Sequence, residues 1–308
     1  MTTPAQQSTS QPPATIRRPT LPGNPHQHAH KIAEAVDTAW HQAHGHGRIE
    51  LPVSVVAALS FLAPDDANRD QAAAALLGLD PAQFARLVRA QWAIFIRARP
   101  DLVNRVWPLI EPWYGNPPLH HEALWAAKKV ADSAIRAGQL HLTGTHRRAD
   151  TDLFGVLLSV LRTRSAKTAR GQFYTSGDVA ELMAHLLELS EQDSVHEPAA
   201  GTGGMLRAVA TVMRRNGRDP ATMTWVAVDI DELAVACLAC NVVLWGLGTK
   251  VLLGVGNGLS DDWITRAQAE RQETLALAES VRTSRLALRL LTAVTGTMAS
   301  ESLGDDQQ

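Results

Sequence analysis

Hydrophobic residues recur at helical spacing through the first half of the chain. Residues 31–138 are rich in alanine, and prolines separate one apolar repeat from the next. A proline lacks a backbone N–H and interrupts a helix, so we expect several short helices joined by proline turns. The prolines concerned are Pro52, Pro64, Pro81, Pro100 and Pro112. One expected helix has an apolar stripe that predicts a buried face, formed by Phe84, Leu87, Val88, Gln91, Trp92 and Phe95.

The second half alternates short β-branched runs with helical repeats. We expect strands at residues 194–196, 224–228 and 250–255, and helices at 205–213 and 232–244. An earlier helix is expected to begin after Ser176, a good N-cap residue, and to run to about residue 189. Strands and helices in this order predict the parallel, right-handed half of a doubly wound fold. After Asp262 an Ala- and Leu-rich helical pattern continues to about Val294.

The composition is that of a globular protein. The chain has 308 residues, of which 45% are hydrophobic and 19% charged, enough for one large or two modest domains. The net charge of −2 gives no overall attraction to phosphates, so contact with nucleic acid needs a local basic patch or a partner. The sequence contains no run of eighteen apolar residues and no signal-peptide pattern, so we expect a cytoplasmic protein without a membrane partner.

The cysteines and histidines do not predict a metal site. Cys237 and Cys240 lie in an apolar helical run, which favours core packing in a reduced, intracellular protein over zinc or redox chemistry. The histidines near the N-terminus lack a completing set of cysteine or carboxylate ligands, so no metal is expected.

A glycine turn is the strongest candidate for chemistry. Residues 196–205 read His-Glu-Pro-Ala-Ala-Gly-Thr-Gly-Gly-Met, in which a strand ends in a carboxylate and passes through glycines into a helix. Glycine allows a sharp turn and close approach of a ligand, and the first amides of the helix have no intrahelical partner. A dehydrogenase that uses a nicotinamide dinucleotide is one alternative, but the G-x-G-G spacing here differs from its G-x-G-x-x-G fingerprint.

Three motifs together resemble the S-adenosylmethionine-binding half of adenine-N6 DNA methyltransferases, and most closely the modification subunit of type I restriction systems. They are Gly171-Gln-Phe-Tyr-Thr175, Glu197-Pro-Ala-Ala-Gly-Thr-Gly-Gly204 and Asp229-Ile-Asp231, and the resemblance covers about residues 165–262. Ser176, Glu197 and Ala200 depart from the proline, aspartate and cysteine that are usual in that family.

The resemblance implies S-adenosylmethionine as the cofactor. The residues expected to bind it are Phe173, Tyr174, Thr175, Glu197, Pro198, Ala199, Gly201, Thr202, Gly203, Gly204, Asp229, Ile230 and Asn257. Asp229 at the end of the second strand would accept from the ribose hydroxyls. Its alternative role is a helix N-cap, which Asp231 could supply instead. Glu197 would lie near the methionine end, and Ile230 against the adenine. Asn257 would accept from the adenine amino group.

The catalytic motif of the family is not found in its usual place. Members carry an Asn/Asp-Pro-Pro-Tyr/Phe turn after a fourth strand, whereas the sequence after Asp262 has no such turn. Asn116-Pro-Pro-Leu119 is an upstream candidate, but Leu119 is not aromatic and a proline turn between helices is favoured. The chain is therefore interpreted as an adenine-N6-specific DNA methyltransferase by resemblance, or alternatively as a catalytically inactive or truncated scaffold subunit of a DNA modification system.

The expected fold is α/β: a partial Rossmann-like methyltransferase sheet with an all-α N-terminal domain and a long C-terminal helix. The expected parts are a disordered tail (1–25), a helical domain (26–150), a cofactor-binding domain (151–262), a helix (263–299) and a tail (300–308). The first strand would keep an open edge, to be covered by the terminal helices or by a protein partner. DNA is implied as a partner, contacted directly or through a partner subunit. The basic residues considered for this contact are Arg162, Arg164, Lys167, Arg170, Arg282, Arg285 and Arg289. For both groups a solvated loop or helix face is the favoured alternative.

Overall fold

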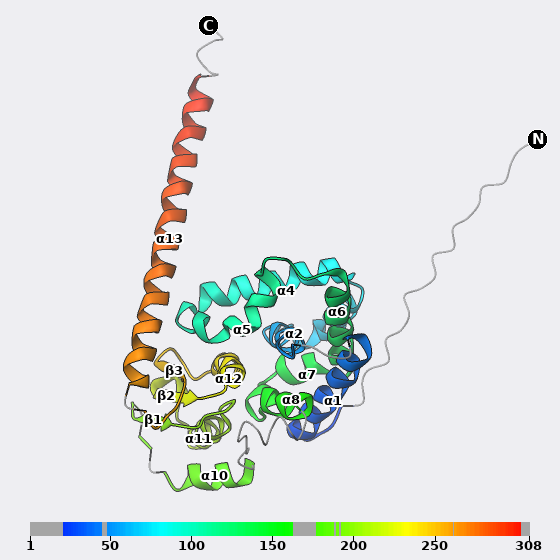
Figure 1. Ribbon diagram of the computed structural model, residues 1–308, viewed down its shortest axis with the longest axis vertical. Coiled ribbons are helices and arrows are strands. Elements are labelled where there is room, and N and C mark those ends of the chain that lie inside the picture. The colour runs from blue at the N-terminus through cyan, green and yellow to red at the C-terminus, as the bar shows by residue number, and fades with distance from the viewer. Residues whose placement is uncertain are drawn as a thin grey trace, which may run out of the picture.

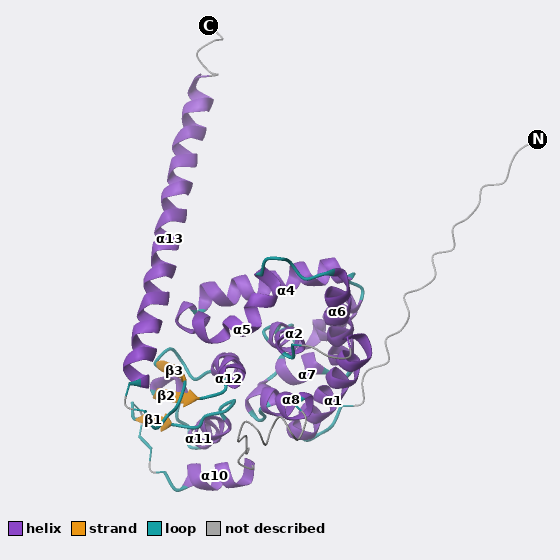
Figure 2. Cartoon of the chain, viewed as in Figure 1, coloured by secondary structure: helices purple, strands orange, loops and turns teal. Residues whose placement is uncertain are grey.

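The computed structural model describes residues 21–44, 48–162, 177–187, 189–190, 192–260 and 262–302. These residues form a group of helices beside a small parallel sheet, and one long helix leaves the sheet (Figure 1). Figure 2 shows that helices make up most of the described chain. Residues 1–20 of the expected tail lie outside the described residues. Residues 21–25 of that tail are described, and Arg147 Nη2 donates hydrogen bonds to the carbonyl oxygens of Pro22 (2.8 Å) and Gly23 (3.1 Å) within it.

The helical part confirms the expected short helices. Its helices are α1 (Pro25–His44), α2 (Glu50–Ser60), α3 (Arg69–Leu77), α4 (Pro81–Ala98), α5 (Val103–Tyr114), α6 (His121–Arg136), α7 (Gln139–Thr143) and α8 (Leu153–Leu161). Short 3-10 turns lie at Asp66–Asn68, Pro100–Leu102 and His146–Ala149. Pro81 begins α4 directly after Asp80, whose side chain accepts from Gln83 N in a capping box.

Pro112 does not end a helix, so that prediction was wrong. It lies inside α5 together with Pro108. The helix continues because its apolar face is buried, and the packing of Val106, Leu109 and Ile110 outweighs the loss of single backbone hydrogen bonds.

The predicted apolar stripe of α4 is buried. Phe84, Val88, Trp92 and Phe95 all belong to the core. Trp92 Nε1 donates to Ser54 Oγ (3.0 Å), and Trp113 Nε1 donates to the same oxygen (2.8 Å). One hydroxyl of α2 thus satisfies two buried indole groups.

The three predicted strands form one parallel sheet. They are β1 (Ser194–Glu197), β2 (Thr224–Asp229) and β3 (Val251–Val255), in the order β1-β2-β3. The helices α11 (Gly204–Arg215) and α12 (Glu232–Leu244) connect them, and a 3-10 turn at Pro220–Thr222 precedes β2. The helix α10 (Gly177–His185) precedes β1 and ends earlier than expected. The strand and helix order predicted from the sequence is confirmed.

The sheet is covered on both faces. Trp225 and Ala227 of β2 belong to the main core, which the sheet shares with the helical part. On the opposite face, Val226 and Val228 pack with Trp263 and the helix that it begins.

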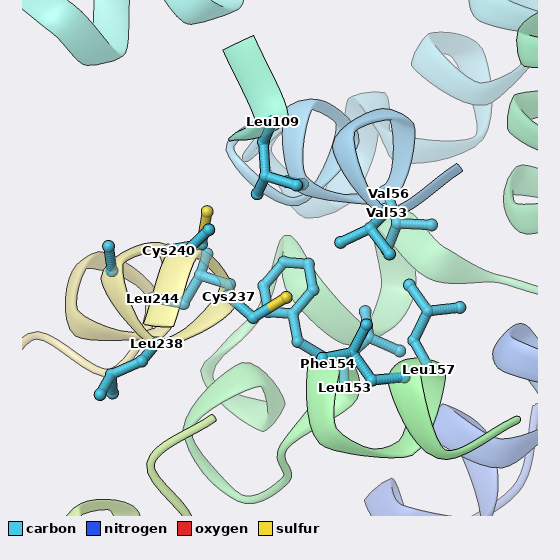
Figure 3. Packing of buried hydrophobic residues seen from close by; sticks show 14 of the residues in the cluster. Val53, Val56, Leu109, Leu153, Phe154, Leu157, Cys237, Leu238, Cys240 and Leu244 are labelled. Carbon is cyan, nitrogen blue, oxygen red and sulfur yellow. The ribbon is translucent and has the colours of Figure 1, made fainter. Parts of the chain in front are cut away.

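The two cysteines lie in the shared core, as predicted. Cys237 and Cys240 are fully buried on α12, and Figure 3 shows them among Phe154 of α8 and Leu109 of α5. Burial raises the pKa of both thiols well above their usual value, which suits a packing role.

The last helix, α13 (Trp263–Ser302), is longer than the sequence predicted. Its 40 residues span about 60 Å, and Figure 1 shows most of it extending away from the rest of the molecule. Arg105 of α5 anchors its first turns, because its guanidinium pairs with Glu270 and its Nε donates to Leu253 O of β3 (2.8 Å). None of the helices in the described ranges is long and apolar enough to cross a membrane.

Candidate functional site

The glycine turn lies between β1 and α11. Gly201 (φ +54°) and Gly203 (φ +96°) adopt left-handed backbone angles, and Gly203 is the N-cap of α11. A Cβ at Gly203 would lie 2.5 Å from a methyl carbon of Leu238, so glycine lets the N-cap of α11 approach the side chain of Leu238 on α12. Gly201 and Gly204 differ, because a Cβ on either would meet nothing within 4 Å. The turn is therefore packed on one side and open on the other.

Asp229 joins the end of β2 to this turn. Its Oδ2 accepts from Gly201 N (2.7 Å), and its Oδ1 accepts from Asp231 N (2.9 Å). Ala200 N also donates to Val228 O (3.0 Å). Each carboxylate oxygen of Asp229 keeps a lone pair beyond these bonds, so the group can still accept from a ligand. The helix N-cap is supplied by Asp231, which accepts from the first amides of α12.

The loop after β3 reaches the same place. Gly256 N donates to Asp229 O (2.9 Å), and a Cβ at Gly258 would overlap with Pro198 O. Asn257 between them is exposed, and its Oδ1 accepts from Leu259 N (3.0 Å). The loops at the carboxyl ends of β1, β2 and β3 are thus in direct contact.

The exposed surface beside these loops is partly apolar. Pro198 and Ala199 are exposed, as is Ile230, with 73% of its surface accessible. Glu197 Oε1 accepts from Ala199 N (3.1 Å), so this carboxylate caps the start of the turn.

Asp152, at the start of α8, bonds to the glycine turn through Thr202. This residue was not among those predicted from the sequence. It caps α8 by accepting from Gly155 N (2.9 Å), and it accepts from Thr202 Oγ1 (2.5 Å) and Asn241 Nδ2 (2.9 Å). Asn241 Nδ2 also donates to Thr202 O (2.9 Å). Burial raises the pKa of Asp152, although all three donors favour its charged form. An acidic residue just before the apolar run 153–161 was a helix-start signal that could have identified it.

Arg162 at the other end of α8 holds the second loop. Its Nη1 lies 2.6 Å from Asp231 Oδ2 and its Nη2 lies 3.1 Å from Oδ1, a bidentate pair with both side chains almost fully buried. The suggestion that Arg162 contacts DNA phosphates is therefore wrong. The pairing depends on a contact between residues 69 positions apart, which no local pattern reveals. Arg164, Lys167 and Arg170 lie outside the described residues.

Of the remaining predicted residues, three lie outside the described part of the chain and one, Asn116, lies between two helices. Phe173, Tyr174 and Thr175 lie outside the described residues. Asn116 is exposed in the loop between α5 and α6, so the described chain places it between two helices rather than after a strand.

The histidines of α1 have structural roles. His28 is buried, and its Nε2 lies 3.1 Å from Ala137 O, while the rings of His26 and His30 meet edge to face. Within the described parts of the chain, no three His, Cys, Asp or Glu side chains are grouped to hold a metal ion. A shallow groove of about 490 Å³ between α1 and α6, lined in part by Lys31, Glu34 and Arg136, contains none of the three loops.

Comparison with known families identifies the segment around the loops. Residues 149–276 match the model of the N-6 DNA methylase family. This segment is an N-6 DNA methylase domain. The domain begins just before α8 and includes the sheet and the first turns of α13. The family inferred from the three sequence motifs is confirmed.

The chain is also similar to a solved structure, over part of that structure's length. That structure is the methyltransferase subunit of a type I restriction-modification system from Streptococcus thermophilus, with 16% identity and a TM-score of 0.40. The match covers 78% of this chain and 60% of that subunit. Comparison with curated proteins gives no match.

Proposed function

We propose that the methylase domain binds S-adenosylmethionine at the carboxyl ends of its three strands, and that the chain acts in methylation of adenine N6 in DNA. The observation that carries the proposal is the hydrogen bond between Asp229 and Gly201, which brings an acidic side chain to an open glycine turn. In doubly wound folds, ligands bind at this edge of the sheet.

The residues around the turn fit such a cofactor. Asp229 can accept from two ribose hydroxyls through its remaining lone pairs, and the first N–H groups of α11 lack intrahelical partners. Space beside Gly201 and Gly204 lets a ligand approach the backbone. Ile230 offers an exposed apolar surface to a purine base. When bound, the cofactor supplies an electrophilic methyl group on a sulfonium.

The remaining assignments follow the resemblance to the family. Glu197 would attract the positively charged methionine end, and Asn257 would hold the adenine amino group. Pro198, Ala199 and Thr202 would line the turn, and Phe173, Tyr174 and Thr175 would cover the cofactor. The chain's own contribution to methyl transfer is to bind and orient the donor beside the target amine.

DNA is the proposed substrate, bound by this chain alone or with a partner subunit. Within the described residues, α13 follows β3 and no further strand is formed, so the group that accepts protons from the target amine remains unassigned on this chain. Asn116 is the candidate that the sequence offers.

A pair of assays tests the proposal. Calorimetry should detect S-adenosylmethionine binding and no binding of a nicotinamide dinucleotide. Incubation with DNA and a donor labelled on the methyl group should then transfer label to adenine. Binding without transfer would point to a cofactor-binding scaffold subunit instead, and absence of binding would refute the proposed site.

A further inference from the structure

The layer of helices beside the sheet extends past β1, the strand at one edge of the sheet. The helix α12 contacts β2 and β3, α11 contacts β1, and α10 contacts α11. Figure 1 shows these helices in a row, with α10 beyond the β1 side of the sheet. Neighbouring helices pack about 8–10 Å apart and strands about 4.8 Å apart, so the position of α10 corresponds to about two further strands.

The face of α10 that no described element covers is apolar. Ala180 and Ala184 are buried, and α10 packs on α11. Four larger residues recur at positions i, i+3, i+4 and i+7 and are between 47% and 75% exposed: Val179, Leu182 and Met183 on α10, and Leu186 in the turn directly after it. Apolar residues at this spacing are typical of a helix that packs on a second surface.

The outer edge of β1 is also open. Among the described residues, β1 pairs only with β2, and Thr224 N donates to Asp193 O at the start of that ladder. Because successive residues of a strand direct their N–H and C=O groups to opposite sides, Ser194 and His196 direct theirs to the free edge. Both residues are exposed. These groups form a template for another strand.

We infer that a second polypeptide docks here by adding strands parallel to β1, with their apolar residues against α10. The unpaired N–H and C=O groups of β1 lie beside the β1–β2 pairing, and the apolar stripe lies beside the buried α10–α11 interface. A single partner chain could therefore pair with the strand and cover the stripe. The inference rests on the proposed function for its strand direction. Only a parallel strand ends at the glycine turn, where the loop that follows it would adjoin the cofactor site.

Two other occupants fit less well. A second copy that paired its β1 with this edge would bring a second α10 into the space that α10 already occupies, since both helices extend past the same edge. The helix α13 leaves from the far side of the sheet, where Arg105 anchors Glu270 beside β3.

The test uses the full chain and a labelled peptide of about ten residues, in which valine and threonine alternate between lysine ends, as a strand probe. His196→Pro removes an N–H that faces the free edge, a position where an edge strand tolerates proline. Leu182→Glu with Leu186→Glu alters the stripe without altering β1. Leu286→Glu, at an exposed leucine of α13, is the matched control.

Fluorescence anisotropy should detect binding to the wild-type chain, weakened about tenfold or more by either edge variant and unchanged by the control. A photocrosslinker on the carboxyl end of the peptide should label residues 198–204. The inference is overturned if the peptide does not bind, if the edge variants bind it normally, or if its amino end labels that segment. Sedimentation showing a wild-type dimer that His196→Pro dissociates would also overturn it, in favour of a second copy. Calorimetry with S-adenosylmethionine on the same samples tests the proposed function separately.

Discussion

The carboxylate of Asp229 accepts a hydrogen bond of 2.7 Å from the amide of Gly201, which joins the end of β2 to the turn after β1. The same carboxylate fixes Asp231 N, and Asp231 in turn caps α12 and pairs with Arg162. A cofactor that bonds to Asp229 would therefore bind to a side chain whose position is already set by two loops, so little ordering entropy would oppose binding.

Replacing Asp229 by alanine should weaken S-adenosylmethionine binding by about tenfold or more, because hydrogen bonds to a charged group contribute about 1.5–3 kcal/mol. The substitution also leaves the amides of Gly201 and Asp231 without their acceptor. Calorimetric titration measures the affinity, and thermal unfolding measures the loss of stability. Glu279→Ala removes an exposed carboxylate of α13 and is the control. Equal affinity in the Asp229 and Glu279 variants would contradict the assignment.

Two neighbouring glycines should respond differently to alanine. At Gly203 the added methyl group meets Leu238 and the backbone angle is left-handed, so Gly203→Ala should destabilise the fold by about 1–3 kcal/mol. At Gly204 the methyl group enters open space, so Gly204→Ala should keep the stability and weaken cofactor binding by occupying the ligand's space.

Urea unfolding and calorimetry on both glycine variants separate the two effects. Unchanged affinity in Gly204→Ala would show that the ligand does not approach this part of the turn. A stable Gly203→Ala variant would contradict the close approach of Gly203 to Leu238.

The strands of the sheet could be predicted because short, local sequence patterns indicate them. β-branched runs such as the one in β2 end at an acidic residue, and the glycine turn after β1 has few alternative structures. The hydrogen bond between Asp229 and Gly201 is a finding of the structure, and it agrees with the rule that parallel strands share their carboxyl edge. The N-cap role of Asp231 was also visible from the sequence.

The contacts that hold the site together could not be predicted in this way. Arg162 lies in a basic segment that is typical of a solvated loop, and only the fold brings it to Asp231. Pro112 remains inside α5 because tertiary burial of that helix outweighs a local preference. Exposure of the α10 stripe likewise depends on what lies beside α10, which sequence spacing does not state.

Removing Arg162 should destabilise the fold strongly. The pair with Asp231 is buried, so Arg162→Ala removes the bidentate cation from a carboxylate in the core and should cost about 3–5 kcal/mol. Arg282→Ala breaks an exposed pair with Glu279 and should cost about 0–1 kcal/mol. The free energy of unfolding in urea measures both. Because the cause is a buried negative charge that has lost its cation, adding Asp231→Asn to Arg162→Ala should restore part of the loss. A double variant that is less stable still would contradict this explanation.

His28 should make the fold sensitive to mild acid. Burial lowers the pKa of His28 from 6.5 to about 4, and its ring nitrogen lies 3.1 Å from Ala137 O. The unfolded chain binds a proton at higher pH than the folded chain does, so this residue's contribution is complete above pH 6.5 and is lost as the pH falls towards 4. His28→Gln keeps a donor for Ala137 O and cannot titrate. Urea unfolding between these pH values should therefore show a smaller loss of stability in the variant than in the wild-type chain. Parallel profiles for the two proteins would show that His28 is not the group responsible.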